Sequence, residues 1–339
     1  MRLASALLLS VLLALPAMSL AQQTEPIVIK VASIAPDGTP WAEQLRDWKR
    51  RLEKASGGRL KIKTYLGGAL GDENVTVQET RRGAIQVFGG STAALASSVP
   101  EIAVVELPYL FRDNSEVDYI LDEVIFDDVS RILEARGFKM LFWAENGWRS
   151  MATRFGCVKT PEDLKGKKMR SQESDVHLEM YRALGASPVP IAATEVLSSL
   201  QTGVVEGFDN TPLFAFASSW YQGITHFTTT RHIYQPGIVV MSMKTYQSLP
   251  DDLKKIVVGD PKAEAVKGRK GVRALEPLLL ENFGNAGKTV CEFPESSRKL
   301  FEARTRVVHD YFRKKRGKKA SQLLDKIEKA LAARRAAAK

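Results

Sequence analysis

The side chains best suited to acid–base or metal chemistry are few in this sequence, and their spacing suits neither task. Four histidines occur in 339 residues, at His177, His226, His232 and His309. None has the paired spacing of metal ligands, and His226 and His232 stand six residues apart across a predicted strand. The sequence also has no HExxH, GxSxG or P-loop motif. We therefore predict a protein that is not an enzyme and that carries no metal or cofactor.

The two cysteines, Cys157 and Cys291, leave three interpretations open. In an oxidising compartment they could form one disulfide that ties the last quarter of the chain to its middle. They could equally be two buried, unpaired side chains, because pairing depends on geometry that a sequence does not show. Cys157 with a distant histidine could also be a nucleophile, although the sequence around it lacks the expected signature.

Arg170 is the strongest candidate for a ligand-binding side chain. It lies near the end of a predicted strand at 167–171, and α/β folds place ligand contacts at strand ends. Its planar guanidinium offers parallel N–H donors that fit a carboxylate, and it stays charged where water is excluded. An ordinary surface arginine at a strand end is the alternative.

The chain that positions these residues has the length of two domains. Apolar residues make up 44% of it and charged residues 26%, as in ordinary globular proteins. The net charge is +10, but residues 301–339 hold 13 Lys/Arg against 4 Asp/Glu and carry nearly all of that excess. Residues 3–300 balance to zero, so we expect no nucleic-acid partner.

The first 21 residues have the order of a secretory signal peptide. Arg2 precedes an uncharged apolar run at 3–15, and Ser19-Leu20-Ala21 offers a small-residue cleavage site. A membrane anchor is the alternative, but the run is shorter than the roughly 20 apolar residues that a span needs. We predict export and cleavage after Ala21.

Predicted strands and helices alternate along the rest of the chain. The predicted strands are 27–33, 60–65, 84–88, 138–144, 167–171, 189–192, 204–208, 224–230 and 236–243. The predicted helices are 40–56, 73–82, 115–135, 175–184, 194–202 and 213–221. This alternation predicts an α/β fold with two lobes.

Two further helical regions are predicted near the C-terminus. Residues 250–284 have helical character, but Gly259, Pro261 and Pro277 fall inside them, so we expect a kink or break near 260 and another near 276. A last helix at about 320–337 carries much of the basic excess. A solvated basic face is the expected role of this helix, and docking to an acidic partner or a membrane surface is the alternative.

Three segments in this order resemble the DctP-type solute-binding proteins of tripartite ATP-independent periplasmic (TRAP) transporters. They are TPEDLKGKKMR at 160–170, YRALGASPVPIAATEV at 181–196 and LQTGVVEGFDN at 200–210. GGALGDE at 67–73, ELPYLF at 106–111 and KASGGRLKI at 54–62 support them. Each segment alone is weak, whereas their order and spacing together are specific, and the resemblance extends to about residue 310.

The resemblance implies two α/β lobes, joined by crossing strands, that close over one small organic anion. The expected parts are lobe I at 22–147 plus about 238–260, lobe II at 148–237 plus about 285–318, a kinked helix spanning both lobes at about 250–284, and a basic C-terminal helix at 319–339. The family delivers its ligand to membrane permease subunits, which implies a periplasmic location. We expect a monomer.

The resemblance also implies roles for three residues. In the family, the arginine at the position of Arg170 forms the salt bridge to the ligand carboxylate. Arg149 matches a second arginine, near the crossover strand, and a hinge salt bridge is its alternative role. Asn210 matches an asparagine whose amide reaches the same carboxylate, and a turn or cap before Pro212 is the alternative.

Some positions depart from the family's pattern. Gln172-Glu173 stands where many relatives that bind sialate or dicarboxylates have Pro-Asn, Ala193 where an aromatic residue is common, and Phe208 where a polar one is common. We expect a cleft of altered shape, larger or more apolar, to which Glu173 adds an acid. The candidate walls, each with core packing as its alternative, are Trp148, Phe208, Phe214 and Trp220. The weaker candidates in the first lobe are Trp41, Asp72 and Ser91.

The sequence thus predicts an exported receptor that captures a small carboxylate-bearing solute and presents it to a TRAP permease. Two other classes stay open. One is a ligand-sensing module that docks to a receptor, and the other is a periplasmic enzyme that uses Cys157 or a histidine.

Overall fold

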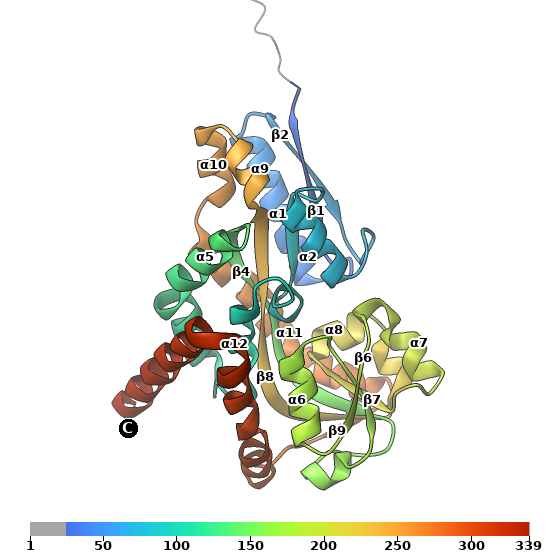
Figure 1. Ribbon diagram of the computed structural model, residues 1–339. Coiled ribbons are helices and arrows are strands. Elements are labelled where there is room, and N and C mark those ends of the chain that lie inside the picture. Colours follow the sequence, from blue (N-terminus) through green and yellow to red (C-terminus); the bar gives the residue numbers. More distant parts are fainter. Residues whose placement is uncertain (1–24, 339) are drawn as a thin grey trace, which may run out of the picture.

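The computed structural model describes residues 25–338 and consists of two α/β lobes built on one continuous sheet (Figure 1). Within these residues the sheet has nine strands, in the order β2-β1-β3-β8-β4-β7-β5-β6, and β9 pairs with β8. The predicted α/β architecture is confirmed. The predicted signal peptide at 1–21 lies outside the described residues.

Lobe I is formed around three parallel strands, β1 (Ile27–Ala32), β2 (Leu60–Tyr65) and β3 (Val87–Ser91). Helix α1 (Pro40–Ala55) begins where Thr39 accepts a hydrogen bond from Ala42 N and proline occupies the first turn. As the spacing predicts, α1 buries Leu45, Trp48 and Leu52 against the sheet. Other helices of this lobe include α2 (Glu73–Arg82), α3 (Thr92–Leu95), α9 (Met243–Ser248) and α10 (Asp251–Val258).

Lobe II repeats this plan with shorter units. Its parallel strands are β5 (Lys168–Ser171), β6 (Ser187–Pro190) and β7 (Gly207–Asn210). Its helices are α6 (Asp175–Ala183), α7 (Val196–Gln201) and α8 (Pro212–Ala217). The carboxyl ends of β5 and β7 lie next to each other, so the residues that follow them meet at one edge of the sheet.

Two long antiparallel strands, β4 (Phe138–Thr153) and β8 (His226–Ser242), connect the lobes. Strand β8 pairs with β3 in lobe I, and β4 pairs with β7 in lobe II. The predictions of a strand ending at 144 and of two separate strands at 224–230 and 236–243 are wrong. The chain continues through the middle because register shifts near 145–147 and 149–151 absorb the bend. The lobe boundaries proposed at 147 and 237 fall inside these strands and stay a prediction.

Several other predicted elements begin or end elsewhere. Strand β3 begins at Val87 instead of residue 84, because Gly83 ends α2 at a φ of 89° and the next two backbone N–H groups still bond to Glu79 O. The predicted helix at 115–135 is divided into α4 (Asn114–Tyr119), a π turn and α5 (Phe126–Ala135). Strand β7 lies two to three residues later than predicted.

The interrupted helix predicted at 250–284 has its break where expected near 260 and none near 276. Helix α10 ends at Gly259, and α11 (Pro261–Asn285) restarts with Asp260 as its cap. Pro277 lies inside α11 without ending the helix. Helix α11 packs on β4, on α1 of lobe I and on α8 of lobe II, so it supports both lobes.

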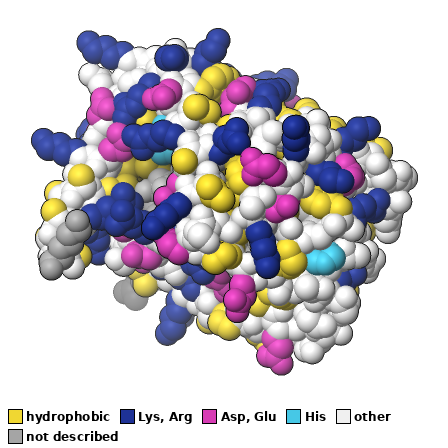
Figure 2. Space-filling model, turned by 90° about the horizontal axis from the view of Figure 1, so that it is seen from below, with side chains coloured by type: hydrophobic (Ala, Val, Ile, Leu, Met, Phe, Trp, Pro, Cys, Tyr) yellow, Lys and Arg dark blue, Asp and Glu magenta, His cyan; other side chains and the backbone are white. Residues whose placement is uncertain are grey.

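The C-terminal helix, α12 (Glu295–Ala337), begins well before the predicted residue 320 and is broken at Gly317, where φ is 78°. Beyond that break Leu324 and Ile327 are buried in the core. Basic residues of α12 pair with acids on other elements, for example Arg335 with Glu116 at 2.7 Å. Figure 2 shows basic and acidic side chains interspersed on one face of the molecule. No helix within residues 25–338 combines the length and apolar character needed to cross a bilayer.

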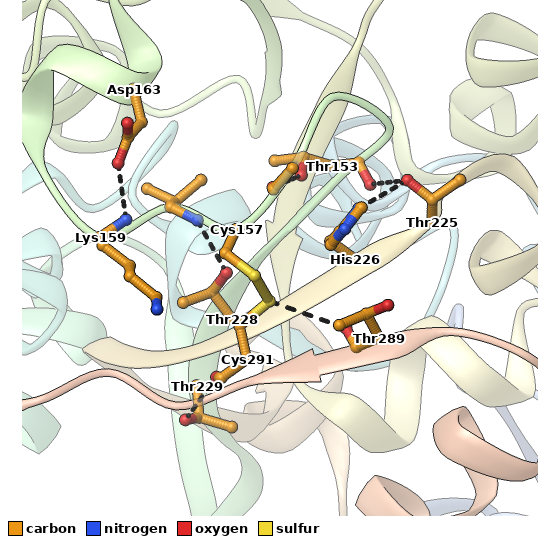
Figure 3. Close-up of a disulfide and its surroundings, with 12 residues drawn as sticks. Thr153, Cys157, Lys159, Asp163, Thr225, His226, Thr228, Thr229, Thr289 and Cys291 are labelled. Atoms are coloured by element: carbon orange, nitrogen blue, oxygen red, sulfur yellow. Dashed lines mark hydrogen bonds between the residues drawn. A yellow bond between two sulfur atoms is a disulfide. The ribbon is translucent and has the colours of Figure 1, made fainter.

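Cys157 and Cys291 form a disulfide, which decides between the three interpretations of these cysteines (Figure 3). It joins the segment after β4 to β9 (Thr289–Cys291), a strand that pairs with β8. The two residues are 134 positions apart in the sequence, so the bond closes a long loop. A sulfur held in a disulfide is not a free thiolate, and the nucleophile interpretation of Cys157 is therefore wrong.

The disulfide predicts a loss of stability on its removal. The Cys157→Ser/Cys291→Ser variant should lose about 2–4 kcal/mol in the free energy of unfolding, because its unfolded chain is no longer constrained by a closed loop. Urea unfolding followed by circular dichroism measures this loss. Wild-type protein treated with a reductant is the matched control and should lose the same amount. An unchanged unfolding midpoint in both would contradict the prediction.

Candidate ligand-binding site

A cavity lies between the lobes, and both lobes and the two crossing strands line it. Lobe I contributes the segment after β1 with Thr39 and Trp41, together with Glu73 and Ser91. The crossing strands contribute Glu145, Asn146 and Gln235. Lobe II contributes mainly Arg170, Gln172, Asn210, Leu213, Phe214 and Trp220. A molecule in this cavity would therefore contact both lobes at once.

Arg170 brings a buried positive charge to the cavity. The residue is 2% exposed, and its Nε donates to Ile191 O at 2.9 Å. Its Nη1 is buried and has no hydrogen-bond partner within residues 25–338. Burial and the neighbouring Arg149 lower the pKa of Arg170 to about 10, so it stays cationic at neutral pH. A buried cation without a counter-ion is costly, and an anionic ligand would remove that cost.

Arg149 lies behind the cavity wall and does not line it. Its Nε donates to Asp209 Oδ2 at 2.6 Å, and neither side chain is exposed. Burial alone would raise the pKa of Asp209, but the charge of Arg149 holds it well below its usual value. The Nη1 of Arg149 also donates to Asn210 Oδ1 at 3.2 Å and Gln235 Oε1 at 2.8 Å. Its charge is thus compensated inside the protein, and it holds two cavity residues in place.

Asn210, at the end of β7, presents its amide nitrogen to the cavity. Its Oδ1 accepts hydrogen bonds from Thr211 N at 2.8 Å, Arg149 Nη1 at 3.2 Å and Asn146 Nδ2 at 3.3 Å. The carbonyl end of the side chain is therefore occupied. The two donors on Nδ2 are the part of this side chain left for a ligand.

Two buried acids face the cavity. Glu73 accepts hydrogen bonds from Ser91 N at 2.6 Å and from Ser91 Oγ at 2.8 Å, and burial raises its pKa to about 7. Glu145 accepts hydrogen bonds from Arg273 Nε at 3.0 Å and Tyr234 OH at 2.7 Å. Burial raises the pKa of Glu145 as well. The two acids are held by the protein and leave Arg170 uncompensated.

The aromatic residues predicted as walls divide into two groups. Phe214 and Trp220 line the cavity and meet edge to face with centroids 5.2 Å apart. The guanidinium of Arg170 lies 5.2 Å from the centroid of Trp220. Phe208 lies behind Trp220 in the core and is not exposed. Trp148 does not line the cavity either, and its Nε1 donates to Asn114 Oδ1 at 2.7 Å.

A second, smaller chamber adjoins the first, and the two share Glu73, Arg170 and Gln172 among their walls. Here Asn74 on α2 donates to Glu173 Oε2 at 2.6 Å, which bridges lobe I and lobe II. A side-chain carbon at Gly68 would lie 3.1 Å from Thr194 Cγ2, so the loop after β2 also meets lobe II closely. The lobes are therefore in contact around the cavity, as in a closed state.

The structure brings most of the predicted site residues together. Those lining the first cavity are Trp41, Ser91, Arg170, Asn210, Phe214 and Trp220. Asp72 and Glu173 line the second chamber. Arg149, Trp148 and Phe208 lie outside both.

Sequence reasoning missed several polar residues that line the first cavity, among them Glu73, Glu145, Asn146 and Gln235. Local signals existed for some of them. Glu73 ends the GGALGDE segment, and Glu145 and Asn146 stand just before Arg149. Gln235 has no such signal, because only the path of β8 across both lobes brings it to the cavity.

The chain is similar in sequence and in fold to bacterial solute-binding proteins. The family model described as DctP, bacterial extracellular solute-binding protein, family 7, matches residues 31–315. A solute-binding protein of Verminephrobacter eiseniae is 32% identical over 301 residues, 88% of each chain. The C4-dicarboxylate-binding periplasmic protein DctP of Rhodobacter capsulatus is 30% identical, over 73% of this chain and 72% of its own. A TRAP periplasmic solute-binding protein from Bradyrhizobium, solved in complex with alpha/beta-D-galacturonate, is 29% identical with a TM-score of 0.84, covering 89% of this chain and 100% of that one.

The raised pKa of Glu73 predicts how stability depends on pH. Between its ordinary value of 4.5 and about 7, the folded protein keeps a proton that the unfolded chain has lost, so the stability of the ligand-free protein should fall as the pH rises through this range. The contribution is on the order of 3 kcal/mol. In Glu73→Gln, the stability measured by thermal unfolding should depend less on pH between 5 and about 7 than it does in wild type. The measurement covers pH 5 to 8. The exposed Glu195→Gln is the control, and a Glu73→Gln profile parallel to that of wild type would refute the assignment.

Proposed function

The chain belongs to the DctP family of bacterial extracellular solute-binding proteins, and from that premise we propose that it is the receptor of a TRAP transporter for a small organic acid. It would capture the acid between its lobes and deliver it to the membrane permease subunits. Solute-binding proteins of this family are not enzymes, and they act outside the cytoplasm.

One observation carries the proposal, the uncompensated guanidinium of Arg170 between the lobes. Its Nη1 is buried without a partner, while Nε is held by Ile191 O. A carboxylate at Nη1 would supply the missing counter-charge with a charge-assisted hydrogen bond. Such a ligand would also contact lobe I, and it would bind the closed state better than an open one.

The neighbouring residues would take supporting roles. The free amide nitrogen of Asn210 would donate to the same carboxylate. Arg149, paired with Asp209, would act by holding Asn210 and Gln235 in position and not by touching the ligand. Trp220 would pack against the guanidinium and keep water from it.

The relatives support the ligand class and the location. The Rhodobacter protein is named for binding C4-dicarboxylates and the Bradyrhizobium protein holds galacturonate, and all of these ligands carry a carboxylate. A periplasmic location agrees with the predicted signal peptide and with the disulfide, which forms in oxidising compartments.

The enzyme alternative has little support. Cys157 is held in the disulfide. His177 and His232 lie in a buried polar network, where His177 contacts Glu106 at 2.7 Å and His232 contacts Asp209 at 3.3 Å. Neither histidine lines the cavity. The sensing alternative would use the same ligand site with another partner, and no observation favours it.

Variants of Arg170 test this proposal. Arg170→Ala should weaken binding at least 100-fold, because among residues 25–338 Arg170 is the only cation that lines the cavity. Arg170→Lys should weaken it about 10-fold, since lysine keeps the charge but loses the planar fork. Isothermal titration calorimetry measures both, with a panel of D-galacturonate, D-erythronate and succinate and with any acid that native mass spectrometry finds co-purified.

Arg182→Ala is the matched control, because Arg182 is a half-exposed arginine of lobe II that pairs with Glu179. It should bind the panel as wild type does. If Arg170→Ala binds an acid as tightly as this control does, the proposed role of Arg170 is wrong.

A further inference from the structure

The two chambers contain positive charge for one carboxylate. Within residues 25–338, Arg170 is the only Lys, Arg or His side chain that lines either chamber. The nearby cations are already neutralised: Arg149 by Asp209, and Arg273 by Glu145 and Asp118. A ligand with two carboxylates would therefore have to bury the second one without a cation.

The second chamber is also acidic. Asp72 and Glu173 line it, and Glu73 stands where it meets the first chamber. The buried Oδ1 atoms of Asp72 and Asn74 have no hydrogen-bond donor within residues 25–338. These atoms only accept hydrogen bonds. A ligand group that contacts these two oxygens would have to donate hydrogen bonds, and a carboxylate cannot do so.

The first chamber is lined by more neutral polar side chains than the second. Thr39, Asn146, Asn210 and Gln235 line it with neutral groups that can donate or accept hydrogen bonds. The buried Nε1 of Trp41 is a donor without an acceptor. A hydroxyl group satisfies both kinds of wall because it donates and accepts, whereas an ammonium group could not accept from Trp41.

We infer that the ligand is a hydroxylated monocarboxylate whose single carboxylate pairs with Arg170, and that the acids of the second chamber exclude a second carboxylate. This inference rests on the proposed function and narrows its substrate class. Glu173, which lines the second chamber, becomes a specificity-determining residue.

The test compares open-chain acids that differ by one carboxylate. D-gluconate is paired with D-glucarate, and D-erythronate with meso-tartrate, so that each pair has one carbon skeleton and exchanges a terminal CH₂OH for a carboxylate. Calorimetry at pH 7.5 should show the monocarboxylate of a pair binding at least 100-fold more tightly than its dicarboxylate. A dicarboxylate that binds within 10-fold of its partner would overturn the inference.

The Glu173→Gln variant tests the cause of this discrimination. It removes one charge and keeps an oxygen that can accept the hydrogen bond from Asn74. The affinity ratio of monocarboxylate to dicarboxylate should fall at least threefold. Glu179→Gln, an acid on α6 that lines neither chamber, should leave the ratio as in wild type. An unchanged ratio in Glu173→Gln would overturn the role of Glu173.

Two outcomes separate this inference from the proposed function. A co-purified dicarboxylate, identified by native mass spectrometry and lost in Arg170→Ala, would overturn the inference and leave the proposed function intact. If neither monocarboxylate binds, and no other acid binds in a way that depends on Arg170, both fail.

Discussion

The structure depends on one electrostatic constraint, a buried guanidinium that the protein itself does not neutralise. Arg170 lies 98% inside the protein, held at Nε by Ile191 O and by the face of Trp220, with Nη1 unpaired. Burying an unpaired cation lowers the stability of the ligand-free protein, and an anionic ligand that pairs with the cation removes this cost. Because the cation lies between two lobes, this gain in stability is coupled to their closure. The same charge that favours an acid therefore favours the closed conformation.

The rest of the fold holds that cation and its neighbours in place. Strands β4 and β8 run through both lobes (Figure 1). Residues near their bend, Glu145, Asn146 and Gln235, line the cavity. The buried pair of Arg149 and Asp209 lies at this bend and bonds to Asn210 and Gln235. Its charges cancel each other, which leaves Arg170 as the cation that a ligand carboxylate meets. The disulfide ties the segment after β4 to β9, and neither cysteine lines the cavity.

Much of the fold could be predicted from sequence, because short-range patterns produce it. Thr39-Pro40 and the spacing of Leu45, Trp48 and Leu52 predict α1, and strand–helix alternation predicts two α/β lobes. The continuity of β4 and β8 could not be predicted, since glycine and proline commonly interrupt a strand. Gly147 and Pro236 nevertheless lie inside these strands, where Gly147 pairs with Gln235 and Pro236 pairs with Glu145. Within the site, Arg170 and Asn210 were identified through motifs at strand ends. Glu145 and Gln235 were missed, whereas Trp148 and Phe208 were assigned to the walls although they do not line the cavity. Both errors have one cause: the face to which a side chain points on a bent strand depends on the register of strand pairing, which the sequence does not show.

The most direct test is a crystal structure of the protein with a bound organic acid. The account predicts that a ligand carboxylate oxygen lies at about 2.8 Å from Arg170 Nη1, with Asn210 Nδ2 donating to the same group and no water between them. A ligand whose carboxylate lies elsewhere in the cavity, with Arg170 bonded only to water or protein, would contradict it.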